Sequence, residues 1–303
     1  MCATRIHADQ LESDERLVRR LISDQFPHWA NLSVTAVPSS GTENAIYRLG
    51  DEMAVRLPYR ANDDQTAKLD HCLPRLAPHL PLPITEPLGR GLPSKAYPAA
   101  WSVVRWLDGE VATLEQLDDP VEAATTLAAF VRSLMKIKPE GGPVPGEHTF
   151  SRGVPLAARD ELTRKAIREC SGLVDTGAVA QAWQQALAVP EWSRPPTWLH
   201  GDLAPDNLLV RDGRLSAVID WGGLAVGDPA TELLPAWNLF LGASRAAYRE
   251  ALGLDEATWR RGRGLALSVA IVALPYYNRT LPGRAENAKS VLRELLADFE
   301  QEA

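Results

Sequence analysis

The chain has 303 residues, 45% of them hydrophobic and 23% charged, and its formal net charge is −7. This composition is ordinary for a globular protein, and the length allows two domains that each bury a core of their own. The acidic balance lacks the basic footprint that is typical of nucleic-acid-binding proteins, so we expect no nucleic-acid partner.

The sequence shows no pattern of export or membrane insertion. The N-terminus lacks the apolar core of a secretory signal, and the most apolar stretch, residues 265–277, is shorter than the ~20 residues that span a bilayer. Cys2, Cys72 and Cys170 form no CxxC pair, which argues against a disulfide framework or a zinc site. We expect a cytoplasmic protein with no membrane partner, and a buried helix over 265–277.

In chain order, the first third of the sequence predicts one helix followed by short strands and a second helix. Apolar residues recur at helical spacing over 11–25, with Ser13 or Asp14 as the N-terminal cap. Strands are expected at 31–37, 43–49, 51–57, after the proline-rich connector 78–87, and at 101–107, with a helix at 63–76.

Helical patterns dominate after Gly109. They cover 113–136, 155–170, 176–188 and most of the chain from Thr231 onward, and a strand–turn–strand unit interrupts them at 207–220. Strands that come first and helices that come later favour an α+β protein over an alternating α/β one.

The polar residues that carry chemistry gather between 197 and 233. Strand-forming runs flank an Asp212–Gly213 turn, so a hairpin would bring its open ends, Asn207 and Asp220, close together. Two oxygen ligands side by side can hold Mg²⁺, which leaves its other positions to phosphates and water. Asp202, five residues before Asn207, could orient an acceptor hydroxyl and take its proton. These parts match the plan of phosphoryl transfer.

The ordered set HGDLAPDN and IDWG resembles the aminoglycoside phosphotransferase family, which shares the protein-kinase-like fold. The resemblance implies that Asp202 is the catalytic aspartate and that Asn207 and Asp220 bind Mg²⁺. It also implies that His200 braces the catalytic loop and that Asp228, in GDPATEL, stabilises it.

The resemblance extends over nearly the whole chain through LPRLAPHLPLPITEPL and WSVVRWLDGE. It implies an α+β, protein-kinase-like two-lobe fold. We expect a small N-terminal lobe with a five-stranded antiparallel sheet, residues 1–107, to clamp the nucleotide. A larger, mainly helical C-terminal lobe, residues 108–303, would carry the catalytic loop and the acceptor pocket.

The family resemblance places an ATP or GTP donor in the N-terminal lobe. The residues implied are Ser40, Gly41 and Thr42 of a phosphate-covering turn, Arg56 on the third strand, and Arg105 and Leu107 of the hinge. An arginine keeps the positive charge of the lysine found there in protein kinases and can grip phosphate with two hydrogen bonds. Taken alone, the turn is an ordinary hairpin turn. For Arg56 the alternative is an exposed strand arginine, and its apolar neighbours favour the phosphate-binding role.

The helix over 63–76 departs from the family pattern. A glutamate that pairs with the strand cation is expected near Leu69, and this chain has leucine between Lys68 and Asp70. Either Asp70 takes that role or the pair is missing. The second case leaves a nucleotide-binding pseudokinase as an alternative, although Asp202 and both metal ligands are present.

The acceptor side is expected in the helical lobe. Acidic candidates for contact with an ammonium-bearing substrate are Asp160, Glu161, Asp206 and Glu232, although a solvated surface charge is the favoured interpretation of each. The leading hypothesis is an O-phosphotransferase that acts on a small hydroxylated molecule of the aminoglycoside type. Alternatives are a kinase for a macrolide, peptide antibiotic, sugar or amino alcohol, and a metal-dependent hydrolase that needs no nucleotide.

Overall fold

The computed structural model describes residues 10–38, 41, 43–61 and 65–301. The chain divides into two compact units, each of which we describe by itself. The first comprises Met1–Pro78, Leu82–Glu110 and Ser216–Ile219, and the second comprises His79–Pro81, Val111–Leu215 and Asp220–Ala303.

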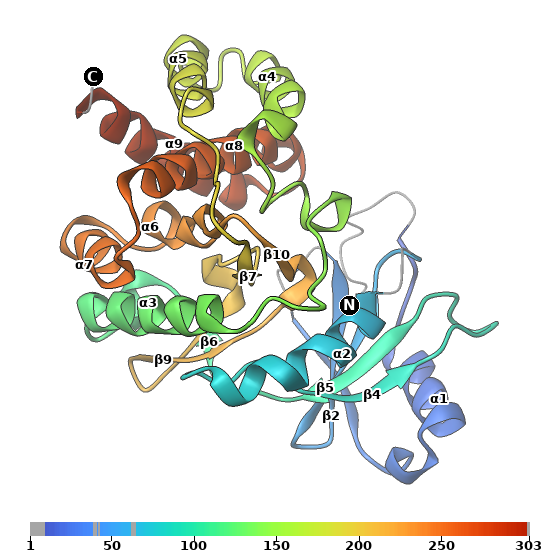
Figure 1. Ribbon diagram of the computed structural model, residues 1–303. Helices are drawn as coiled ribbons and strands as arrows, with labels where there is room; N and C mark the ends of the chain where they lie inside the picture. Colours follow the sequence, from blue (N-terminus) through green and yellow to red (C-terminus); the bar gives the residue numbers. More distant parts are fainter. Residues whose placement is uncertain (1–9, 39–40, 42, 62–64, 302–303) are drawn as a thin grey trace. The chain divides into compact units, whose positions relative to one another are not determined.

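The first unit is built on a five-stranded antiparallel sheet in the order β1-β2-β3-β5-β4, which confirms the expected sheet (Figure 1). Its strands are β1 (Val34–Val37), β2 (Asn44–Leu49), β3 (Met53–Pro58), β4 (Pro87–Gly91) and β5 (Trp101–Arg105). The first strand begins three residues later than expected, because Leu32 N donates to Trp29 O in a turn that precedes it. Gly50, with φ 57°, makes the tight β2–β3 connection.

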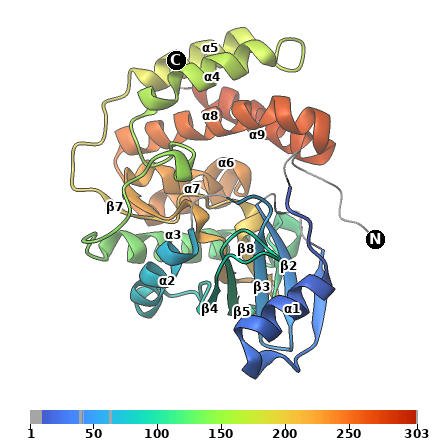
Figure 2. The same cartoon turned by 90° about the vertical axis from the view of Figure 1, so that its right-hand side faces the viewer.

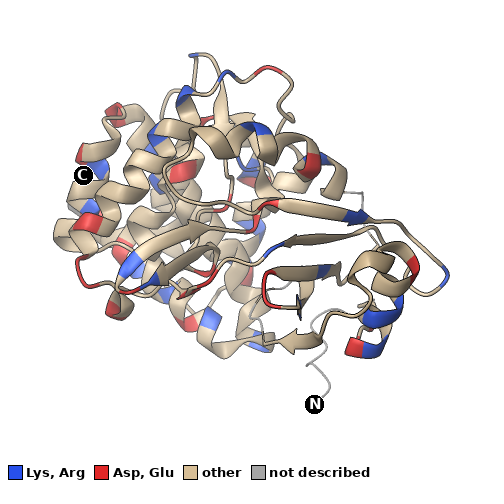
Figure 3. Cartoon of the chain, turned by 90° about the horizontal axis from the view of Figure 1, so that it is seen from below, with Lys and Arg blue, Asp and Glu red and all other residues tan. Residues whose placement is uncertain are grey.

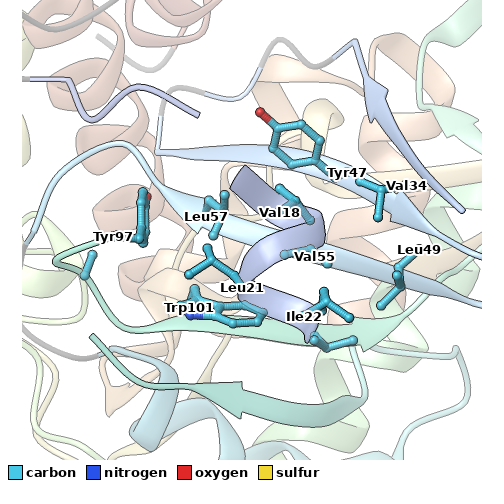
Figure 4. Packing of buried hydrophobic residues seen from close by; sticks show 12 residues of the cluster. Val18, Leu21, Ile22, Val34, Tyr47, Leu49, Val55, Leu57, Tyr97 and Trp101 are labelled. Carbon is cyan, nitrogen blue, oxygen red and sulfur yellow. The ribbon is translucent and has the colours of Figure 1, made fainter. Parts of the chain in front are cut away.

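Helix α1 (Glu15–Gln25) covers this sheet with an apolar face. Asp14 caps the helix by accepting a hydrogen bond from Leu17 N at 2.7 Å, as one of the two expected caps. Val18, Leu21 and Ile22 of α1 then pack against sheet residues that include Val55 and Trp101 (Figure 4). Helix α2 (Gln65–Leu76) packs beside β4. The first unit therefore has its own buried core.

The second unit is mainly helical. Its helices are α3 (Pro120–Lys136), α4 (Asp160–Glu169), α5 (Thr176–Leu187), α6 (Pro235–Asn238), α7 (Gly242–Leu252), α8 (Glu256–Thr280) and α9 (Pro282–Gln301). Helices α8 and α9 lie side by side, α3 packs on α7, and α4 and α5 pack on α8 (Figure 2). The expected buried helix over 265–277 is confirmed as part of α8.

Two helix starts in this unit differ from the sequence-based expectation. The helix expected from residue 113 begins at Pro120, because the Asp119 carboxylate caps the backbone N–H groups of Val121 and Glu122. The segment before it contains only a 3₁₀ turn, Leu114–Gln116. The helix expected from 155 likewise begins with a 3₁₀ turn, Leu156–Arg159, and continues as α4.

Short strands carry the segment that holds the candidate site. β7 (Thr197–Leu199) pairs antiparallel with β10 (Ala225–Gly227), and β6 (Glu110–Val111), β8 (Leu208–Arg211) and β9 (Arg214–Val218) form a sheet in the order β6-β8-β9. The β8–β9 turn confirms the expected hairpin: Asp212 and Gly213 have φ values of 50° and 72°, the positive pair that such a tight turn requires.

Charged residues of both signs are interspersed along the ribbon in Figure 3. Several of them form ion pairs one helical turn apart, such as Arg19 with Glu15 and Lys165 with Glu169. Among the residues that the structure describes, no helix is long and apolar enough to cross a membrane.

Candidate active site

The loop from His200 to Asn207 joins β7 to β8 and is braced from inside the second unit. His200 is completely buried, and its ring lies 4.6 Å from the ring of Trp221. The Asp202 N–H donates a hydrogen bond to Nδ1 of His200 at 3.2 Å. The imidazole therefore fixes the backbone on which the Asp202 carboxylate stands.

Asn207 closes the other end of this loop. Its Nδ2 donates a hydrogen bond to the backbone carbonyl of Asp202 at 2.8 Å, and its backbone N–H donates to Ala204 O at 2.9 Å. The residue is only 8% exposed. Because the amide nitrogen is committed to Asp202, the side-chain oxygen Oδ1 of Asn207 is the atom left to bind a cation.

Asp220 stands at the start of the next turn, the 3₁₀ helix Trp221–Gly223, with φ 59° and ψ 70°. Aspartate is one of the few residue types that tolerate this left-handed region. The turn lies against the loop: a Cβ added to Gly201, itself at φ 84°, would come within 2.1 Å of Gly223 O. The structure thus brings the Asp220 turn beside the loop that carries Asp202.

Arg152 is a neighbour of Asp202 that the sequence reasoning missed. Its Nη1 lies 2.5 Å from Oδ1 of Asp202 and donates a hydrogen bond to Gly201 O at 3.1 Å. The arginine side chain is 13% exposed and that of Asp202 is 37% exposed. No motif or spacing in the sequence indicates this pair, because Arg152 and Gly201 are 49 residues apart.

The backbone before Arg152 adopts an unusual conformation. Phe150 and Ser151 both have φ 53°, a left-handed value that costs free energy for residues with a Cβ. The Phe150 carbonyl accepts a hydrogen bond from Arg159, whose Nε donates to Ser268 at 2.9 Å. Burial lowers the pKa of Arg159 to about 10. A buried network therefore holds this turn in place.

Glu232 lies behind the loop and is completely buried, so its interpretation as a surface charge is wrong. Its Oε1 accepts a hydrogen bond from Gly201 N at 2.9 Å, and Oε2 is buried without a hydrogen-bond partner. Burial raises the pKa of Glu232 to about 7, although the backbone N–H groups of Gly201 and His200 oppose the shift. The Tyr248 hydroxyl donates to the Glu232 carbonyl at 2.7 Å.

Asp228 connects the segment after β10 to helix α8. Its Oδ1 accepts from Ala230 N at 2.9 Å and caps the 3₁₀ helix Pro229–Leu233. Its Oδ2 lies 2.7 Å from Nε of Arg261, and both side chains are nearly buried. The Asp228 backbone N–H also donates to Gly153 O at 3.1 Å, next to Arg152.

The remaining acidic candidates differ in their surroundings. Asp160 accepts hydrogen bonds from Arg164 at 2.7 Å and from Trp183 at 2.8 Å, both within the helical unit. Glu161 is exposed on α4. Asp206 pairs with Arg284 of α9.

The candidate nucleotide residues lie in the first unit. Ser40 and Thr42 fall outside the described residues, and Gly41 is partly exposed. Arg56 lies on β3, in register with Ile46 and Ser102. Arg105 ends β5 and pairs with Glu86 at 2.5 Å.

Beyond β5 the chain continues through the expected hinge. Leu107 is partly exposed, and none of the described hydrogen bonds engages its backbone N–H or carbonyl. The Arg48 guanidinium covers the ring of Trp106 at 4.0 Å, which agrees with a packing role for this tryptophan.

The model of the phosphotransferase enzyme family, APH, matches residues 34–265. The chain belongs to this phosphotransferase family. Among curated relatives, this family member is 27% identical over 151 residues to an aminoglycoside 3'-phosphotransferase of Escherichia coli and to one of Salmonella typhimurium. The match covers 46% of this chain, which spans about half the length (52%) of either relative.

Solved structures show that this family member shares its fold with other members. The GDP complex of wild-type aminoglycoside 2'-phosphotransferase-IIIa superposes with a TM-score of 0.75 and 20% sequence identity. The match covers 95% of this chain and 100% of the chain in that complex. A macrolide 2'-phosphotransferase, MphH from Brachybacterium faecium, matches 92% of this chain and 97% of its own, with a TM-score of 0.58 and 21% identity. The expected protein-kinase-like fold and the family resemblance are confirmed.

Proposed function

We propose that this phosphotransferase moves the γ-phosphate of ATP or GTP to a hydroxyl group of a small molecule, with an aminoglycoside as the first acceptor class to test. Residues 1–107 would hold the nucleotide, and residues 108–303 would hold the catalytic loop and the acceptor. The relatives named above, an aminoglycoside 3'-phosphotransferase and an aminoglycoside 2'-phosphotransferase that binds GDP, support this proposal.

The observation that carries the proposal is the hydrogen bond from Asn207 to the Asp202 carbonyl, at the closed end of a loop that is braced by His200. It joins the residue proposed as the base to one proposed as a metal ligand. The contact between Gly201 and Gly223 adds the turn that carries Asp220. The proposed base and the proposed metal ligands lie on neighbouring backbone segments, and phosphoryl transfer requires such an arrangement.

The residues present fit a magnesium ion. Asn207 offers a side-chain oxygen whose amide nitrogen is already bonded, and Asp220 offers a carboxylate, so both donors are of the oxygen type that Mg²⁺ selects. The described part of the chain contains no cluster of three or more His, Cys, Asp or Glu side chains able to hold a metal. Two protein ligands suit Mg²⁺ in kinases, where it neutralises the charge of the phosphates.

In this proposal Asp202 receives the proton of the acceptor hydroxyl. Its Oδ1 contacts Arg152, and among the described residues nothing hydrogen-bonds to Oδ2, which is free to accept from the acceptor. As the acceptor oxygen bonds to the γ-phosphorus, the bond from phosphorus to the β–γ bridging oxygen breaks and the nucleoside diphosphate leaves. The loop supplies position and electrostatics, and no covalent intermediate is needed.

The other candidate residues keep the roles proposed from the sequence. Gly41, Ser40, Thr42 and Arg56 would contact the phosphates. Arg105 and Leu107 would offer backbone groups to the purine edge, and within the described part of the chain no hydrogen bond engages the backbone of Leu107.

The acceptor contacts are proposed for the helical lobe. Glu161 and Asp206 are the exposed and half-exposed acidic candidates. Asp160 and Glu232 make internal hydrogen bonds that would have to be shared with a substrate.

The test is phosphate transfer by the purified protein with magnesium and ATP or GTP. Acceptors would be kanamycin, gentamicin and streptomycin, a macrolide, and a set of sugars and amino alcohols. We expect transfer to at least one acceptor and a loss of about 10²–10⁴-fold in the Asp202→Ala variant, with nucleotide binding retained. A variant as fast as the wild type would exclude Asp202 as the base. Nucleotide binding without any turnover would favour the pseudokinase, to which Leu69 points.

A further inference from the structure

We infer that Arg152 is a positioning residue for phosphoryl transfer: it holds the Asp202 carboxylate by one oxygen and leaves the other oxygen to the acceptor hydroxyl. The inference rests on the proposed function, since it assigns Asp202 the role of base. It adds a residue that belongs to none of the motifs HGDLAPDN, IDWG and GDPATEL.

The contact geometry of Arg152 supports a positioning role. A single nitrogen, Nη1, lies 2.5 Å from Asp202 Oδ1 and 3.1 Å from Gly201 O, so the guanidinium spans the backbone and the side chain of adjacent loop residues. Such a two-point contact restricts rotation of the Asp202 side chain about its own bonds. Asp202 is 37% exposed whereas Arg152 is 13% exposed, so the pair presents the carboxylate and covers the arginine.

The loop from Asp202 to Asn207 contains no positive charge of its own, since its sequence is DLAPDN. A cation that approaches Asp202 must therefore come from another segment. Arg152 provides it from the turn between the 3₁₀ helix Glu147–Thr149 and the 3₁₀ helix Leu156–Arg159. The charge is thus placed by tertiary structure and not by the loop sequence.

The turn that carries Arg152 is fixed on both sides. On the N-terminal side, Arg159 holds the Phe150 carbonyl, and Thr149 O accepts from Arg152 N at 3.0 Å. On the C-terminal side, a Cβ on Gly153 would come within 2.8 Å of Leu199, the last residue of β7. A flexible exposed arginine would need no such support.

Backbone strain in the turn before Arg152 also supports a positioning role. Phe150 and Ser151 both occupy the left-handed region, which is costly for non-glycine residues and persists only when surrounding contacts enforce it. Arg159, only 3% exposed, together with buried Ser268, provides that enforcement. Strain that is maintained next to a proposed base is typical of a segment that pre-organises a site.

The test compares Arg152→Ala, Arg152→Lys and Arg152→Met with the wild type, using ATP and magnesium with the best acceptor of the panel, or with water as acceptor. We expect Arg152→Ala to lower kcat about 10²-fold with little change in KM for nucleotide or acceptor, because misplacement by about 1 Å has that effect. Lysine should restore part of kcat, and added guanidinium chloride at millimolar concentration should raise kcat of the alanine variant. Methionine, which keeps the packing, should stay as slow as alanine.

A double-mutant cycle separates this role from others. If Arg152 acts only through Asp202, the variant that combines Arg152→Ala with Asp202→Ala is as slow as Asp202→Ala alone. A further loss in the double variant, or a large rise in KM for ATP, would place Arg152 on the phosphates and overturn the inference. Wild-type kcat in a folded Arg152→Ala or Arg152→Met variant would overturn it as well.

A control variant and a folding measurement accompany the kinetic comparison of the Arg152 variants. Arg194→Ala removes an exposed ion pair with Asp255 in the same unit and should leave kcat unchanged. Melting temperatures show which variants are folded. Turnover that does not depend on Asp202 would refute the proposed function itself, whereas Asp202-dependent turnover that is indifferent to Arg152 refutes only this inference.

Discussion

Replacing Glu232 by glutamine should change how the stability of the protein depends on pH. Glu232 is completely buried, and burial raises its pKa from 4.5 to about 7. Between these pH values the unfolded chain has released the proton while the folded chain retains it, so the folded state binds more protons. The free energy of unfolding contributed by this group therefore falls as the pH rises from about 4.5 to 7, and it is constant above that.

The size of the effect follows from the shift. One pKa unit corresponds to about 1.4 kcal/mol, so the rise from 4.5 to about 7 corresponds to about 3 kcal/mol above pH 7. Glutamine keeps an oxygen that can accept from Gly201 N but cannot ionise. Its extra N–H group adds an offset that is independent of pH. The wild type should thus lose about 3 kcal/mol relative to Glu232→Gln between pH 4.5 and pH 8.

Urea denaturation of both proteins at pH 4.5, 5.5, 6.5, 7.5 and 8.0 measures this difference. Near the transition it corresponds to roughly 6–12 °C in relative melting temperature. Glu169→Gln serves as the control, because Glu169 is an exposed partner of Lys165 and should leave the pH dependence unchanged. Parallel curves for the wild type and Glu232→Gln would show that the buried carboxyl does not titrate in this range, and the reasoning would be refuted.

Three further predictions concern metal binding and stability. Asp220→Ala should raise the magnesium concentration for half-maximal phosphate transfer at least about tenfold, measured by titration with the metal. Arg261→Ala should lower the free energy of unfolding by about 3–5 kcal/mol, measured in urea, because it leaves the Asp228 carboxylate buried without its cation. Asp14→Ala should lower it by about 1 kcal/mol through loss of the α1 cap.

Each of these predictions has a result that would contradict it. An unchanged magnesium requirement would remove Asp220 from the metal site. Equal stability of Arg261→Ala and the control Arg194→Ala would show that the Asp228 pair is no stronger than an exposed one. A cap variant as stable as the wild type would mean that water replaces Asp14 at the end of α1.

Local sequence signals predicted the parts of the fold that depend on local chemistry. The Asp212–Gly213 turn follows from the preference of these residues for positive φ, and the Asp14 cap follows from the position of an acidic side chain before an apolar repeat. The start of α3 was predicted too early although the signal was present. Asp119 followed by Pro120 is typical of the start of a helix. The prediction followed the apolar pattern upstream of these two residues and therefore placed the start too early.

The rest of the site depends on contacts between distant segments. Glu232 stands in a short polar motif that says nothing of its depth, and its burial results from packing with Gly201 and Tyr248. Arg152 reaches Asp202 from a turn in which two residues with side chains occupy the left-handed region, where a sequence pattern would predict glycine. Neither contact has a signature in spacing or composition.

The meeting of Gly201 with Gly223 has a consequence for motion during turnover. With no side chain between them, the two backbones are in direct contact, so neither turn can move toward the other without displacing it. The proposed oxygen ligands and the proposed base would then come no closer together while nucleotide and product exchange.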